Sequence, residues 1–154
     1  MKKINLLLAL FCSATLFAQD INKPTLIKEA STNPIDIAYE KWELPNGLKV
    51  LIHEDHSDPI VHVHVTYHVG TNRETAGKSG FAHFFEHMMF QGSEHVPDEV
   101  APRIIAEAGG QLNGNTSYDR TVYLQTVPSN HLETILWLES DRMGFLPNAV
   151  TKEK

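Results

Sequence analysis

The pattern His-x-x-Glu-His at residues 83–87 constrains this chain more than any other stretch. It lies in a run without proline or glycine, residues 81–91, which predicts a helix. On a helix, His83 and His87 lie one turn apart on the same face, where two imidazoles can bind one zinc ion. Glu86 falls on the same side and could take a proton from a water molecule. The alternative is a buried helix whose histidines hydrogen-bond to neighbouring groups.

The rest of this run is apolar on almost every side, a pattern typical of a buried helix. Its apolar residues are Phe81, Phe84, Phe85, Met88, Met89 and Phe90. Burial makes three polar groups on one face costly unless something pairs with them. A dication and its bound water would do so. The sequence therefore predicts a metal-binding motif on a buried helix.

Length and composition indicate about one globular domain. The chain has 154 residues, of which 42% are hydrophobic and 21% charged. The formal net charge of −6 argues against nucleic-acid binding through phosphate neutralisation.

Residues 1–18 have the features of a signal peptide. Lys2 and Lys3 precede an apolar stretch with small residues toward its end, and cleavage is expected after Ala18. The stretch is too short and interrupted for a stable membrane anchor, although an uncleaved anchor is the alternative. We therefore expect export to the periplasm or the exterior. Cleavage would remove Cys12, the only cysteine, and with it any disulfide chemistry.

The segment up to residue 69 predicts three strands. Residues 19–38 are polar and without a clean period, as in a linker or N-terminal arm. Residues 39–54 form a predicted hairpin around Asn46-Gly47. Residues 60–69 alternate strictly, with valines and Tyr67 on one face. The other face carries His62, His64 and His68, which we interpret as a solvated polar face rather than a second metal site.

The remaining elements are two helices and two strands. A helix begins at Asp98-Glu99 and ends at Gly109-Gly110; strands follow at 111–117 and 121–127. A third helix is expected after Pro128, with Ser129 as its N-cap and with Gly144 and Pro147 interrupting it. The order βββ-αα-ββ-α predicts an α+β fold with a mainly antiparallel sheet.

Three blocks of the sequence resemble the pitrilysin/insulinase (insulysin) family of zinc metallopeptidases. The first runs from Val69-Gly70-Thr71-Asn72-Arg73-Glu74 through the His-x-x-Glu-His pattern, whose order is that of the inverzincins. The second is residues 109–116 with Thr121 and Tyr123, and the third is residues 139–143. The resemblance covers roughly residues 40–154.

The resemblance implies roles for four residues. His83 and His87 would be zinc ligands, with one zinc ion per site, and Glu86 the catalytic base. Asn113 would contact the main chain of a peptide that adds to an edge strand. The family fold packs helices on one face of the sheet. Its third zinc ligand is a glutamate expected beyond Lys154, and Glu133, Glu139 and Glu153 do not match that position.

Family members are longer and have two related halves that enclose the substrate. Residues 39–154 therefore correspond to the N-terminal portion of a catalytic domain, a truncated or partial domain that needs a second homologous half or partner chain. The leading hypothesis is a zinc-dependent endopeptidase acting on extended peptides. The alternative is a noncatalytic structural or partner subunit, or an inactive fragment, on the same fold.

Overall fold

A computed structural model describes residues 23–28 and 37–151. The chain divides into two compact units, one ending at His56 and the other beginning at Ser57. The predicted signal peptide, residues 1–18, lies outside the described residues, and so do its expected cleavage site and Cys12.

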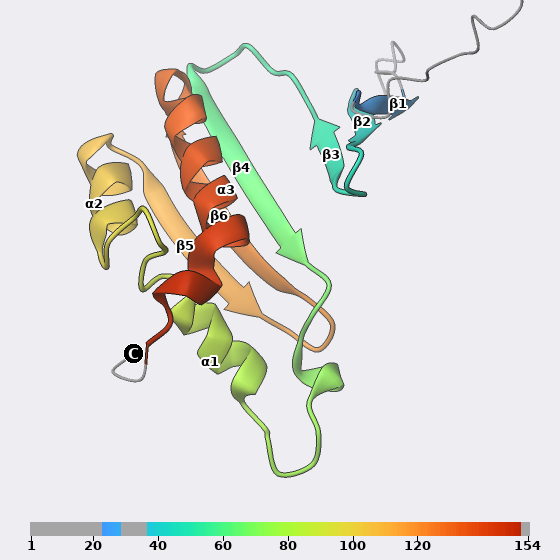
Figure 1. The fold of residues 1–154 in the computed structure, drawn as a ribbon. Helices are drawn as coiled ribbons and strands as arrows, with labels where there is room; N and C mark the ends of the chain where they lie inside the picture. The colour runs from blue at the N-terminus through green and yellow to red at the C-terminus, as the bar shows by residue number, and fades with distance from the viewer. Residues whose placement is uncertain (1–22, 29–36, 152–154) are drawn as a thin grey trace, which may run out of the picture. The chain divides into compact units, whose positions relative to one another are not determined.

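The first unit contains an antiparallel sheet of three strands in the order β1-β2-β3 (Figure 1). The strands are β1 (Thr25–Lys28), β2 (Glu40–Glu43) and β3 (Lys49–Ile52). The hairpin between β2 and β3 is confirmed, and Gly47 supplies the left-handed turn residue with φ +85°. β1 was not predicted, because it lies in residues 19–38, which were interpreted as a linker or arm. Four residues without alternation do not predict a strand, and only pairing with β2 reveals one.

The second unit is built on an antiparallel sheet in the order β4-β6-β5. β4 spans Ile60–Tyr67, β5 spans Gln111–Thr116 and β6 spans Thr121–Pro128. All three predicted strands are confirmed. β6 is the central strand of this sheet. β5 pairs with β6 on one side, and its other side has no strand partner among the described residues.

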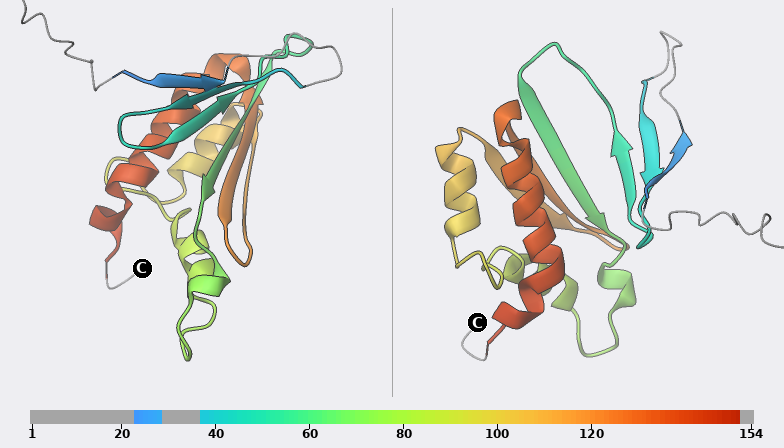
Figure 2. Two further views of the ribbon diagram at one scale, coloured as in Figure 1. Left: turned by 90° about the vertical axis from the view of Figure 1, so that its right-hand side faces the viewer. Right: turned by 45° about the horizontal axis from the view of Figure 1, so that its top comes forward.

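Alternation along each strand gives this sheet one covered face. Val63 lies opposite Gln125, and Tyr123 lies between Val65 and Gly114 in the register. The valines of β4 are half-buried, whereas His62 and His64 on the other face are exposed. The predicted solvated face of β4 is thereby confirmed. Figure 2 shows the helices gathered on one side of the sheet, as predicted.

The described residues of this unit also form three α-helices and two short 3-10 helices: η1 (Thr71–Arg73), α1 (Phe81–Met88), α2 (Val100–Glu107), η2 (Ser129–His131) and α3 (Leu132–Ala149). The buried apolar core lies between α2, α3 and β6 and consists of Val96, Ile105, Val127, Ile135 and Leu138. None of the helices in the described ranges is long and apolar enough to cross a membrane.

The predicted burial of α1 is wrong for this chain. The helix forms where expected, but only Glu86 and Met88 are buried in it. Phe81, Phe84 and Phe85 are 49%, 53% and 53% exposed. A single sheet edge can cover only one side of a helix, and no element among the described residues covers the opposite side.

The predicted boundaries of α3 are also wrong. Ser129 is not its N-cap: the chain enters through η2, and α3 begins after His131 without a side-chain cap. Gly144 and Pro147 do not interrupt the helix, which continues to Ala149. Pro147 falls in the last turn, so the missing backbone N–H removes a hydrogen bond only near the helix end.

Candidate functional site

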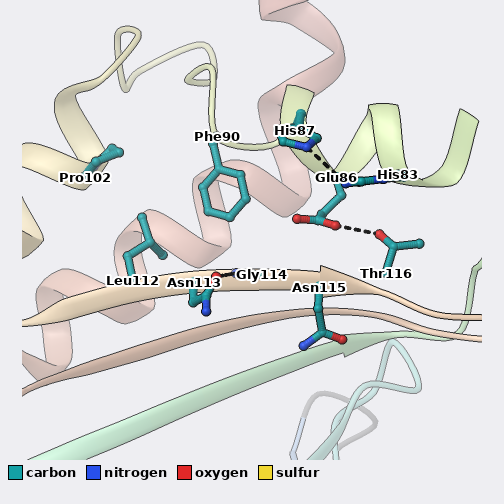
Figure 3. A pocket seen from close by; sticks show the side chains of 10 residues that line it. All are labelled: His83, Glu86, His87, Phe90, Pro102, Leu112, Asn113, Gly114, Asn115 and Thr116. Carbon is teal, nitrogen blue, oxygen red and sulfur yellow. Dashed lines mark hydrogen bonds between the residues drawn. The ribbon is translucent and has the colours of Figure 1, made fainter. Parts of the chain in front are cut away.

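The two histidines of α1 point toward one another. Their Nε2 atoms are 3.1 Å apart and their ring centroids 4.8 Å apart (Figure 3). Tetrahedral zinc with bonds of about 2.0–2.1 Å to two imidazoles implies nitrogens about 3.3 Å apart. The helical turn between His83 and His87 therefore places two nitrogens at nearly the separation that one zinc ion requires.

Glu86 is buried between α1 and β5. Its Oε2 accepts a hydrogen bond of 2.8 Å from the hydroxyl of Thr116 (Figure 3). A Cβ added at Gly114 would lie 3.1 Å from Glu86 Oε1 and 2.9 Å from Phe90 Cζ. Because Gly114 has no side chain, the β5 backbone can approach α1 closely and still leave room for the Glu86 carboxylate. Oε2 is oriented by Thr116, whereas Oε1 has no hydrogen bond in the described part of the chain.

These side chains line a pocket of about 570 Å³. α1 contributes both histidines and Glu86, α2 contributes Pro102, and β5 contributes residues 112–116; Phe90 completes the lining. The pocket therefore joins the polar face of α1 to the strand that lies at the sheet edge.

Asn113 lines the pocket but its side chain points to the other side of β5 from Glu86 (Figure 3). Its Oδ1 accepts a hydrogen bond from the backbone N–H of Gly114 at 2.9 Å. The substrate contact predicted for Asn113 stays a prediction.

Behind Phe90 lies a buried polar cluster of α3 and the sheet. The Arg142 guanidinium stacks 4.6 Å from the Tyr123 ring and donates to Glu139 Oε1 at 2.8 Å. Gln125 donates to the same oxygen. Burial raises the pKa of Glu139, and burial together with the Glu139 charge raises the pKa of Tyr67 to about 12. The phenol of Tyr67 is thus neutral at physiological pH.

A third buried carboxylate, that of Asp141, joins α3 to the loop after α1. Asp141 accepts hydrogen bonds from Ser93 and from His95 Nδ1, the latter at 2.6 Å. Burial works against ionisation, but the bonds from Ser93 and His95 outweigh it and lower the pKa of Asp141. Asp141 thereby holds α3 to the loop after α1, and Arg142 holds α3 to the sheet, although neither residue lines the pocket.

The described residues do not complete a metal site on their own. No group of three or more histidine, cysteine or acidic side chains is arranged to hold a metal ion within residues 23–28 and 37–151. Glu139 Oε1 accepts hydrogen bonds from both Arg142 and Gln125.

The role of Thr116 was not predictable from the family resemblance or from a local motif. The available signal was positional: Thr116 lies two residues after Gly114 and therefore on the same face of the strand. That signal required knowing which face of β5 meets α1.

The family model for insulinase, peptidase family M16, matches residues 49–144. The chain belongs to this family. One relative, the zinc protease PqqE of Helicobacter pylori, is 34% identical over 109 residues, which cover 70% of this chain and 24% of PqqE. The resemblance deduced from the sequence is confirmed.

Two solved structures agree with the fold. A protease from Helicobacter pylori gives a TM-score of 0.71 at 31% identity, covering 75% of this chain and 27% of that one. The first half of the periplasmic protease PqqL from Escherichia coli gives 0.66 at 26% identity, covering 77% and 26%. The predicted α+β architecture is confirmed. The chain spans about a quarter of the length of these relatives.

Proposed function

We propose that this chain carries the metal-binding helix and catalytic base of a zinc-dependent endopeptidase that hydrolyses extended peptides. The observation that carries the proposal is the 3.1 Å approach of His83 Nε2 and His87 Nε2 beside the buried carboxylate of Glu86. Family membership and the name of PqqE, a zinc protease, support the same chemistry.

His83 and His87 would hold the zinc ion. A catalytic zinc ion usually has three protein ligands and one open position. The described residues supply two nitrogens with suitable spacing, so the proposal includes a further carboxylate ligand from outside them. When bound, zinc supplies Lewis acidity, which polarises a carbonyl and makes water more acidic.

Glu86 is proposed as the general base and later the general acid. Thr116 occupies Oε2, and this leaves Oε1 as the atom that accepts a proton from the attacking water. The same carboxyl then donates that proton to the leaving amine. Burial between α1 and β5 fixes its orientation before substrate arrives.

The substrate is proposed to be an extended peptide that lies along β5. β5 lies at the edge of its sheet in the described part of the chain, and its residues 112–116 line the pocket; a strand edge binds peptide main chain through backbone hydrogen bonds. Asn113 would contact that main chain once its side chain releases the N–H of Gly114.

Export and assembly form a further part of the proposal. The apolar N-terminus supports export to the periplasm or exterior, and PqqL is named a periplasmic protease. The PqqL structure is that of its first half, which supports a second homologous half or partner chain around the substrate.

The test is peptide hydrolysis, with and without a chelator, by the complete protein together with the proposed second half or partner chain. We expect cleavage that the chelator abolishes and zinc restores. Glu86→Gln should retain zinc and lose at least about a hundredfold in kcat, the scale of general acid–base catalysis. Wild-type turnover by Glu86→Gln would overturn the base assignment.

A second candidate is a noncatalytic partner subunit or inactive fragment on the same fold. The presence of only two suitably placed donors among the described residues favours it. Zinc binding without peptide turnover in both wild type and Glu86→Gln would establish this alternative.

A further inference from the structure

The N-terminus of α1 is capped by the side chain of Glu74, six residues before the N-cap. Gly80 is the N-cap, with φ +92°, and it has no side chain to accept hydrogen bonds. A helix start leaves four backbone N–H groups without intrahelical partners, here those of residues 80–83. The Glu74 carboxylate accepts two of them, from Gly80 N at 2.9 Å and from Ala82 N at 2.8 Å.

Glu74 is itself held to the sheet. It follows η1, whose Thr71 N donates to Ser117 O at 3.1 Å and whose Asn72 N donates to Tyr118 O at 2.7 Å. Gly70 packs so closely on this turn that an added Cβ would lie 2.3 Å from Ser117 O. The turn between β5 and β6 therefore anchors η1, and Glu74 connects this anchor to the start of α1.

Both histidines lie in end turns of α1, His83 in the first and His87 in the last, and helix ends fray. The first turn is the one that Glu74 caps. Fraying there would move His83 Nε2 away from His87 Nε2. A carboxylate at a helix N-terminus also interacts favourably with the helix dipole.

We propose that Glu74 is a positioning residue for the metal pair: its carboxylate joins the β5–β6 turn to the first turn of α1 and holds His83 at zinc-binding distance from His87. This inference rests on the proposed function, because it takes the pair to be the zinc ligands. Glu74 touches neither zinc nor substrate and acts through the helix backbone.

The test measures zinc affinity by chelator competition in the full 154-residue chain at neutral pH, together with amide hydrogen exchange at Gly80 and Ala82, the two amides that donate to Glu74. Glu74→Ala removes both acceptors, and Glu74→Gln keeps one. We expect zinc affinity to fall about tenfold in Glu74→Ala, the lower end for loss of a group that orients ligands. The loss should be smaller in Glu74→Gln, and exchange at both amides should be faster in each variant.

Two controls separate positioning from charge and from general stability. Glu94→Gln removes the same charge at an exposed carboxylate that accepts from Asn148, and Ile135→Val weakens the core without touching α1. Both should bind zinc as wild type does.

Three results would overturn the inference: wild-type affinity and exchange in Glu74→Ala, weaker zinc binding without faster amide exchange, or an equal loss in Glu94→Gln. Absence of zinc binding by the wild type would instead reject the proposed metal pair. The amide exchange of the Glu74 variants would then decide the capping by itself.

Discussion

Helices α1 and α3 differ from the usual rule that apolar side chains are buried and charged ones exposed. α1 is rich in phenylalanine, yet Phe84 and Phe85 are half exposed and Glu86 is buried. α3 buries three charged residues, Glu139, Asp141 and Arg142. Each of these three charged groups has a partner: Arg142 pairs with Glu139, and Asp141 accepts from Ser93 and His95.

This difference shows that the burial of a helix residue depends on whether another element packs over it and whether its polar groups find partners, rather than on the apolar content of the helix. α3 lies along the covered face of the β4-β6-β5 sheet and meets polar groups from Gln125 and Ser93. α1 meets the sheet only through the side that carries Glu86 and Met88. The following substitutions test this contrast, beginning with the largest expected effect.

Arg142→Ala should have the largest effect on stability. It leaves the buried Glu139 carboxylate without its cation, and breaking a buried pair from one side costs about 3–5 kcal/mol. Chemical denaturation would measure the loss. Arg103→Ala, on the exposed side of α2, is the matched control and should change stability by less than about 0.5 kcal/mol. Similar effects of the two would show that the α3 cluster is unimportant.

Met88→Ala and Phe84→Ala compare the two sides of α1 directly. Met88 is buried, so its truncation should cost about 2–3 kcal/mol. Phe84 is half exposed, and the better helix propensity of alanine offsets part of its lost packing, so the change should stay within about 0.5 kcal/mol. A larger loss for Phe84→Ala would mean that the aromatic side of α1 is covered.

Asp141→Asn should cost about 1.5–2 kcal/mol at neutral pH, because hydrogen bonds to a charged group are lost. The pKa of Asp141 is lowered in the folded state, so its contribution is present above the unfolded pKa, about 3.9. The contribution is lost as pH falls through the lower folded pKa. Denaturation at several pH values should therefore show a weaker acid dependence in the variant.

Ile135→Val is the control for Asp141→Asn, because it shifts stability equally at every pH without changing a charge. An acid dependence in Asp141→Asn as steep as in wild type would contradict the role of this carboxylate.

Features with a local period were predictable from the sequence. The spacing of His83 and His87 gives the helix turn that brings their nitrogens together. Alternating valines give β4, and Asn46-Gly47 gives the hairpin turn. In each case the signal lies within a few residues, so backbone geometry alone carries it.

Features that depend on distant partners were not predictable. Thr116 reaches Glu86 from a strand 30 residues away, and Asp141 meets His95 across 46 residues. No local pattern distinguishes these polar residues from solvated ones. The exposure of α1 was missed for the same reason, since apolar content shows what a helix could bury and not what covers it.

The most direct test of the account is a zinc titration of the chain that follows the imidazole NMR signals of His83 and His87. The account predicts that both rings respond together, with saturation at one zinc ion per chain, and that His83→Ala and His87→Ala each abolish the response of the remaining ring. Independent responses of the two rings, or a response of His62 and His64 in their place, would contradict a shared metal site on α1.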